Sequence, residues 1–117
     1  MAAMTDTQQS LVERVRGLLD PDVPVREVSM FGGRAIMAND KMIVSVGKDG
    51  SLLVRVDTND HDRLLQQPGA SQAEMGTGRS MGPGWITIAP DHLTTDQALD
   101  AWIEEAMIYN RTTTARP

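Results

Sequence analysis

The sequence contains no cysteine, and this absence removes several kinds of site. Disulfides, thiolate metal centres and a cysteine nucleophile are all excluded. The first ten residues have neither the basic region nor the apolar core of a secretory signal. No apolar run approaches the roughly 20 residues that a membrane-spanning helix needs. We therefore expect a cytoplasmic protein that has no membrane partner.

Aromatic and basic residues are also scarce. The aromatic residues are Phe31, Trp85, Trp102 and Tyr109, too few for an evident base-stacking platform. The 11 Lys and Arg residues are outnumbered by 16 Asp and Glu residues, which gives a net charge of −5. Because phosphate backbones repel an acidic protein, strong non-specific nucleic-acid binding is not expected.

The length of 117 residues is that of a single domain with an ordinary hydrophobic core. Apolar residues at helical spacing predict one helix over about residues 6–19 and another over about 96–110. A short helix is expected over residues 61–67. We expect order over about residues 5–110 and a flexible tail over residues 111–117.

Capping signals stand at the start of each predicted helix. Thr5 with Gln8 has the spacing of a capping box, and Thr94 with Gln97 repeats it before the last helix. The short helix is expected to be capped from residues 58–60.

Alternating apolar residues and turn signals predict a run of strands. Asn39-Asp40 is a turn of the kind that accepts positive φ, and Gly47 to Gly50 is a second hairpin signal. These connections are too short for a parallel crossover. The predicted fold is α+β, an antiparallel meander of five or six strands with the N- and C-terminal helices packed on it. The expected strands are residues 25–30, 34–38, 41–46, 51–56 and 85–89, with a short one around 73–75.

A paired glycine follows the first predicted strand, in the segment Phe31-Gly32-Gly33. The residue pattern of a Walker loop is not present here. A dinucleotide fingerprint lies between a strand and a helix, whereas here strand follows strand. A β-bulge or tight corner is the expected reason for the two glycines.

No group of residues points to a reaction. His61 and His92 are far apart, and we expect both to be solvated at helix starts rather than bound to a metal. Gly78, Ser80 and Gly82 spell the nucleophile-elbow pattern of hydrolases, but a strand rather than a helix follows them. We expect no catalytic residue, no metal and no cofactor, and hence no enzyme.

Two sets of residues leave alternatives open. Arg34, Arg55 and Arg79 could gather into an anion site or remain separate surface residues. The methionines between Met30 and Met81 could form a soft binding groove or fill the core.

Several segments together match the pattern of a known family. They are Met30-Phe31-Gly32-Gly33, Asn39-Asp40-Lys41-Met42, Leu52 to Val56, Gly69, Gly78-Arg79-Ser80-Met81, Gly84-Trp85-Ile86, and Leu99 to Ile103 with Ala106. Over about residues 11–109 the chain resembles the N-terminal domain of the TfoX/Sxy competence regulators. The resemblance implies a compact α+β domain of the bacterial cytoplasm, in a family that regulates competence genes by acting with other transcription factors. The chain is expected to be a stand-alone member without the family's C-terminal helical domain.

We expect a non-enzymatic regulatory module that contacts another protein, such as a component of the transcription machinery, or a second copy of itself. A direct nucleic-acid-binding regulator is the first alternative, and a small-ligand-binding or catalytic domain the second. Exposed glycine-rich loops beside aromatic and arginine side chains are typical of binding surfaces. The predicted interaction surface consists of Phe31, Gly32, Gly33, Arg34, Arg55, Arg79, Met81 and Trp85.

Overall fold

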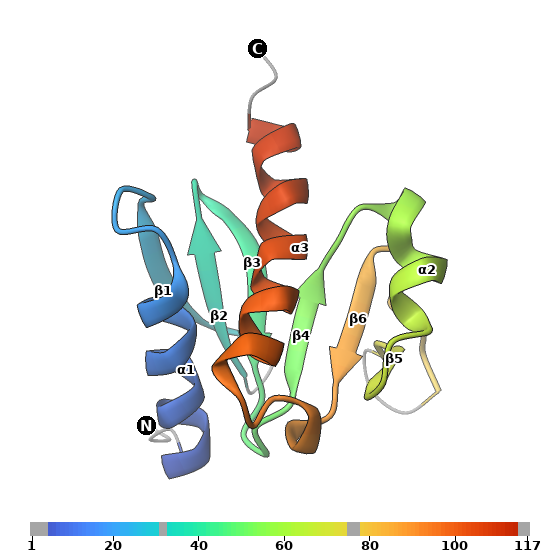
Figure 1. Cartoon of the computed structure of the whole chain (residues 1–117), viewed down its shortest axis with the longest axis horizontal. Coiled ribbons are helices and arrows are strands. Elements are labelled where there is room, and N and C mark those ends of the chain that lie inside the picture. Colours follow the sequence, from blue (N-terminus) through green and yellow to red (C-terminus); the bar gives the residue numbers. More distant parts are fainter. Residues whose placement is uncertain (1–4, 31–32, 75–77, 115–117) are drawn as a thin grey trace.

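A six-stranded antiparallel sheet carries helices on one face (Figure 1). The computed structural model describes residues 5–30, 33–74 and 78–114. This architecture confirms the predicted α+β class. The elements are α1 Asp6–Leu18, β1 Val25–Met30, β2 Gly33–Ala38, β3 Lys41–Val46, β4 Leu52–Arg55, η1 Thr58–Asp60, α2 His61–Leu65, β5 Ala70–Gln72, β6 Trp85–Ile88, η2 Pro90–His92 and α3 Asp96–Thr114.

The strand order is β1-β2-β3-β4-β6-β5. The first four strands form the predicted meander. After β4 the chain forms η1 and α2, runs along the sheet edge as β5, and returns as β6 between β4 and β5. This insertion sets the last residue of β4, Arg55, opposite the first residue of β6, Trp85.

The two turns at the ends of β3 form as the sequence predicts. Asn39 and Asp40 both have positive φ, 52° and 65°, in the two-residue connection between β2 and β3. Gly50 has φ 88° in the hairpin that leads into β4. Tight turns of this kind are set by local residue chemistry, so their positions could be predicted.

A β-bulge lies within β3. Pairing between β2 and β3 shifts after Ile36, which leaves Ile43 as the extra residue of β3. Ile43 and its neighbour Val44 are both buried as a result. Of the predicted corner, Phe31 and Gly32 lie outside the described residues. Gly33 belongs to β2 and pairs with Met30 in ordinary register.

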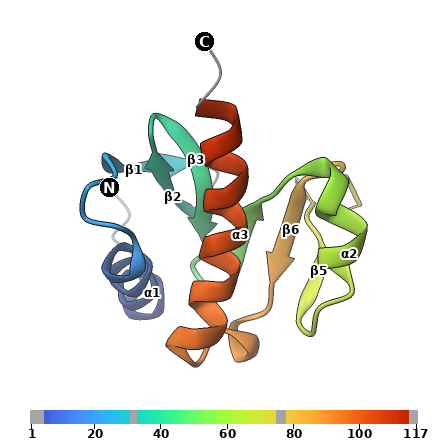
Figure 2. The same ribbon diagram turned by 45° about the horizontal axis from the view of Figure 1, so that its top comes forward.

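Helices α1 and α3 lie side by side across the sheet, as Figures 1 and 2 both show. α2 packs against β5 and β6, and an ion pair of 3.5 Å between Arg63 and Glu105 joins it to α3. The core lies between the helices and the sheet. Burying one of its large aliphatic side chains contributes about 1.5–3 kcal/mol. One row across the sheet consists of Ile36, Val44, Val54 and Ile86, and none of these side chains is exposed.

Thr5 caps α1 as predicted, because its hydroxyl accepts a hydrogen bond of 3.1 Å from the Gln8 N–H. The second half of the capping box differs. The Gln8 side chain is buried and donates instead to the Val46 carbonyl, at 3.0 Å. Gln8 thereby joins α1 to the end of β3, which no local spacing could have shown.

The other predicted caps are displaced. Thr95, rather than Thr94, accepts from the Ala98 N–H at the start of α3, at 3.1 Å. Asp57, just before residues 58–60, accepts from the Asn59 N–H and caps η1. Neighbouring Ser, Thr, Asp and Asn residues are all competent caps, so the path of the chain selects among them.

Three element boundaries also differ from the predictions. β5 covers Ala70–Gln72 rather than residues 73–75, of which Met75 lies outside the described residues. α2 ends at Leu65, before the predicted 67. α3 continues through Thr114, so residues 111–114 of the predicted tail are helical. No helix in the described ranges has both the length and the apolar character needed to cross a membrane.

The hairpin before β4 makes stability depend on pH. Hydrogen bonds from the Ser51 hydroxyl and backbone hold the pKa of Asp49 below its ordinary value of 3.8. A lowered pKa contributes stability above the unfolded-state pKa, and this contribution is lost as the pH falls through the folded-state pKa. We expect Asp49→Asn to be less stable than the wild type at neutral pH, with the difference shrinking below pH 3.8. Urea unfolding of the wild type and the variant, at neutral pH and below pH 3.8, measures this difference in stability. A difference that persists at the lower pH would contradict the lowered pKa of Asp49.

Candidate functional site

Arg55 is the centre of a stacked cluster at the end of β4. Its guanidinium carbon lies 4.9 Å from the ring centre of Trp85 and 4.7 Å from that of Tyr109. Nη2 donates to the Tyr109 hydroxyl at 3.0 Å, and Nη1 donates to the Val56 carbonyl at 3.2 Å. Cation–π contacts with two rings and two hydrogen bonds hold this side chain in one orientation.

Gly84 makes room for that guanidinium. Its φ is +94°, a region that favours glycine, and a Cβ placed there would overlap Arg55 Nη1. The Gly84 carbonyl also accepts from the Val56 N–H, at 2.9 Å, so the two backbones run close together. A larger residue at this position would therefore displace the arginine.

His61 fixes the position of Gly84. Its side chain is buried, and Nδ1 accepts from the Gly84 N–H at 2.9 Å. The ring proton is therefore on Nε2, which donates to Gln72 Oε1 at 2.8 Å. The prediction that His61 is solvated is wrong, because the chain after β5 folds over this helix start. His92 is exposed, as predicted.

Gln72 extends the network into the loop before β6. Its amide nitrogen donates to the carbonyls of Ala73, Gly82 and Trp85, at 3.2, 3.0 and 3.2 Å. The network from His61 through Gln72 thus ties α2 and β5 to the segment that carries Trp85.

A pocket of about 350 Å³ lies beside the stacked cluster. β3 and β4 pair with each other from Val44–Val54 to Val46–Leu52. β3 already begins at Lys41, and β4 continues to Arg55. The parts of these two strands that do not pair with each other, together with the last turns of α3, form the walls of the pocket. Side chains in the lining include Met37, Lys41, Met42, Arg55, Trp85 and Tyr109.

Hydrogen bonds fix α3 over this pocket. Asn110 is buried, and its amide nitrogen donates to the Ala38 carbonyl at 2.9 Å. Its oxygen accepts from the Asn39 side chain, also at 2.9 Å. Lys41 Nζ donates to the Thr113 carbonyl at 3.3 Å. The helix wall is therefore anchored to the turn between β2 and β3.

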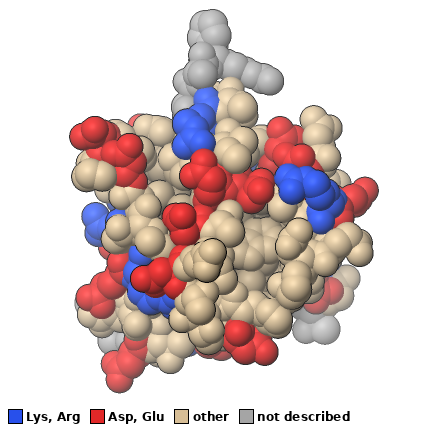
Figure 3. Space-filling view, in the orientation of Figure 1, with Lys and Arg blue, Asp and Glu red and all other residues tan. Residues whose placement is uncertain are grey.

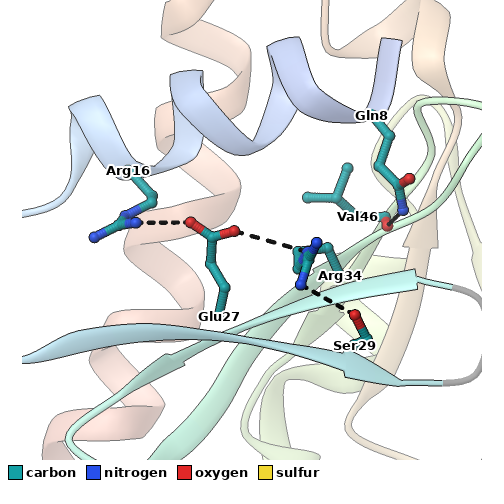
Figure 4. A network of polar contacts seen from close by, with 6 residues as sticks. All are labelled: Gln8, Arg16, Glu27, Ser29, Arg34 and Val46. Carbon is teal, nitrogen blue, oxygen red and sulfur yellow. Dashed lines mark hydrogen bonds and ion pairs between the residues drawn. The ribbon is translucent and has the colours of Figure 1, made fainter. Parts of the chain in front are cut away.

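Arg34 lies at the opposite end of the sheet, opposite Val46. Figure 4 shows its guanidinium between Ser29 and Glu27, with Nη1 donating to the Ser29 hydroxyl at 3.0 Å and Nε 3.7 Å from Glu27. The other Glu27 oxygen pairs with Arg16 of α1, at 2.7 Å. Arg34 is thus bonded into the contact between α1 and the sheet.

The predicted interaction surface is therefore divided between the two ends of the sheet. Arg55 and Trp85 are in contact and partly exposed. Met81 is partly exposed at the same end of the sheet, one segment away from Trp85: its N–H donates to the Ala73 carbonyl, and the Ala73 N–H donates to the Trp85 carbonyl. Arg79 is exposed in the same loop, so the three arginines considered as an anion site do not gather. Gly33 and Arg34 lie at the far end, and Phe31 and Gly32 lie outside the described residues.

Neither Tyr109 nor His61 was predicted to belong to this site. Tyr109 is 54 residues from Arg55, and no local pattern pairs them. His61 and Leu64 are buried at helical spacing, which is a weak signal for a buried histidine. Met37 and Met42 line the pocket, which favours the groove among the two uses considered for the methionines.

In the part of the chain that the structure describes, no three His, Asp or Glu side chains are placed to hold a metal ion together. The cluster instead presents a fixed cation, aromatic surface and flexible thioethers. These groups can bind an anion or an apolar group.

Comparison with known protein families identifies a matching domain. The profile of the TfoX N-terminal domain matches residues 17–108, which include the whole sheet and most of α3. No curated protein and no solved structure matches the chain. With most of its length covered by this profile, the chain belongs to the TfoX N-terminal domain family.

Proposed function

We propose that this chain is a non-enzymatic regulatory module of the cytoplasm that binds a protein partner of the transcription machinery. The family is of a regulatory type and is not a known enzyme family, which supports the regulatory part. The observation that carries the binding part is the partly exposed stack of Arg55 on Trp85. Tryptophan and arginine dominate the binding energy of protein interfaces, particularly when they are held rigid.

The proposed surface consists of Arg55, Met81 and Trp85. Arg34 is left out because Glu27 and Ser29 occupy its guanidinium at the other end of the sheet. Met81 is well suited to an interface, since a thioether adapts to the shape of a partner.

Affinity capture from native cell extract with paired variants tests the proposal. Met81→Glu adds a charge to the proposed surface, and Ile108→Glu adds the same charge to the outer side of α3, where Ile108 is 43% exposed. We expect Met81→Glu to lose a partner that the wild type and Ile108→Glu retain. Retention by Met81→Glu, or loss only in Ile108→Glu, would reject this surface. Solution mass measurement then separates a distinct partner from a second copy of the chain.

A direct nucleic-acid-binding role receives less support. On the helix side of the molecule, Figure 3 shows Lys and Arg as separate groups among Asp and Glu rather than as one basic patch. A gel shift at low ionic strength, where phosphate contacts are strongest, tests it.

A further inference from the structure

We propose that the pocket beside Arg55 binds a small organic carboxylate that carries an apolar group. This inference goes beyond the protein-binding role and does not depend on it. It follows from the charge, the lining and the rigidity of the pocket.

Within residues 5–30, 33–74 and 78–114, no carboxylate pairs with Arg55. Its hydrogen bonds go to a hydroxyl and a carbonyl, both neutral. Among the described arginines, only the exposed Arg79 shares this lack of an ion pair. The others are paired: Arg14, Arg16, Arg26, Arg34, Arg63 and Arg111 each lie within 4.0 Å of an Asp or Glu oxygen.

A partly buried cation without a counter-charge is unfavourable unless something solvates it. The two rings offset part of this penalty, and the two hydrogen bonds use part of the donor capacity of the guanidinium. A ligand carboxylate beside Arg55 would supply charge-assisted hydrogen bonds. Asp40 also lines the pocket, but its carboxylate is 91% exposed and pairs with Arg26 at 3.6 Å. Arg55 is therefore left for an external anion.

The rest of the lining selects for an apolar group on the ligand. Met37 and Met42 are partly exposed on one side, and the Trp85 ring lies on the other. The volume of about 350 Å³ lies in the range of about 300–1,000 Å³ that small-molecule sites occupy. An inorganic ion would leave most of this apolar space unfilled.

The cation is also fixed before any ligand arrives. Gly84 leaves space for the guanidinium, and Tyr109 holds it on the side of α3. Because little side-chain freedom remains to be lost, the entropy penalty of binding is small.

Titration of the purified full-length chain with benzoate and with hexanoate, followed by NMR, tests the proposal. We expect saturable shifts of the Trp85 indole N–H signal and of the backbone amide signals of Met42 and Asn110. Benzamide has nearly the shape of benzoate but no charge, and we expect it to bind at least about tenfold more weakly.

Two variants separate Arg55 from a general charge effect. Arg55→Gln is expected to weaken benzoate binding at least about tenfold. Arg16→Gln removes the same charge from α1 and is expected to leave binding unchanged. The absence of saturable shifts with both carboxylates, equal binding of benzoate and benzamide, or equal effects of the two variants would overturn the proposal. The benzamide comparison needs no variant, so misfolding of Arg55→Gln cannot obscure the result. Because no protein partner is present, failure here leaves the partner proposal intact.

Discussion

Replacing His61 with alanine is expected to lower the free energy of unfolding by roughly 3 kcal/mol, from a lost side chain and lost hydrogen bonds. The ring is buried, and it accepts from Gly84 N–H while donating to Gln72. Without it, a buried N–H and a partly buried amide oxygen lose their partners, and a cavity remains. The total stability of a domain is typically only about 5–15 kcal/mol.

Urea denaturation measures this effect as a fall in the midpoint at unchanged slope. His92→Ala is the matched control, because His92 is exposed and a surface substitution usually changes stability by about 0.5 kcal/mol or less. If the two alanine variants lose similar stability, the buried network does not hold the loop in place.

Gly84→Ala is expected to lower the free energy of unfolding by about 2–4 kcal/mol and to displace Arg55. Positive φ at a residue with a Cβ accounts for about 1–2 kcal/mol of this. The rest comes from the overlap of the new Cβ with the Arg55 guanidinium, which then loses its contacts with the Trp85 and Tyr109 rings. A shift of the Trp85 fluorescence should accompany the loss, since the arginine leaves the indole.

Gly82→Ala is the control that separates the backbone penalty of positive φ from the effect of contact with Arg55. Gly82 has a similar φ, +86°, but among the described residues other than its chain neighbours no atom lies within 4 Å of the position its Cβ would take. It should therefore show only the backbone penalty, with the Trp85 fluorescence unchanged. Equal stability losses and equal spectra for the two variants would show that contact with Arg55 contributes nothing.

The division of the predicted surface shows where sequence reasoning reached its limit. The sequence predicts an exposed glycine-rich binding surface at the segment from Phe31 to Arg34 and at the loop leading to Trp85. Whether they are neighbours depends on strand order. β6 lies beside β4, and Arg34 and Trp85 consequently stand at opposite ends of the sheet.

Residues close together in the chain were sufficient to predict the main helices and turns of this protein. Apolar spacing located α1 and α3, turn residues set the hairpins, and short connections required antiparallel pairing. Other contacts could be known only from the folded chain: His61 is buried against Gly84, 23 residues away, and Tyr109 meets Arg55 across 54 residues. Such contacts form when distant segments pack, because packing and burial act on proximity in space and leave no periodic trace in the sequence.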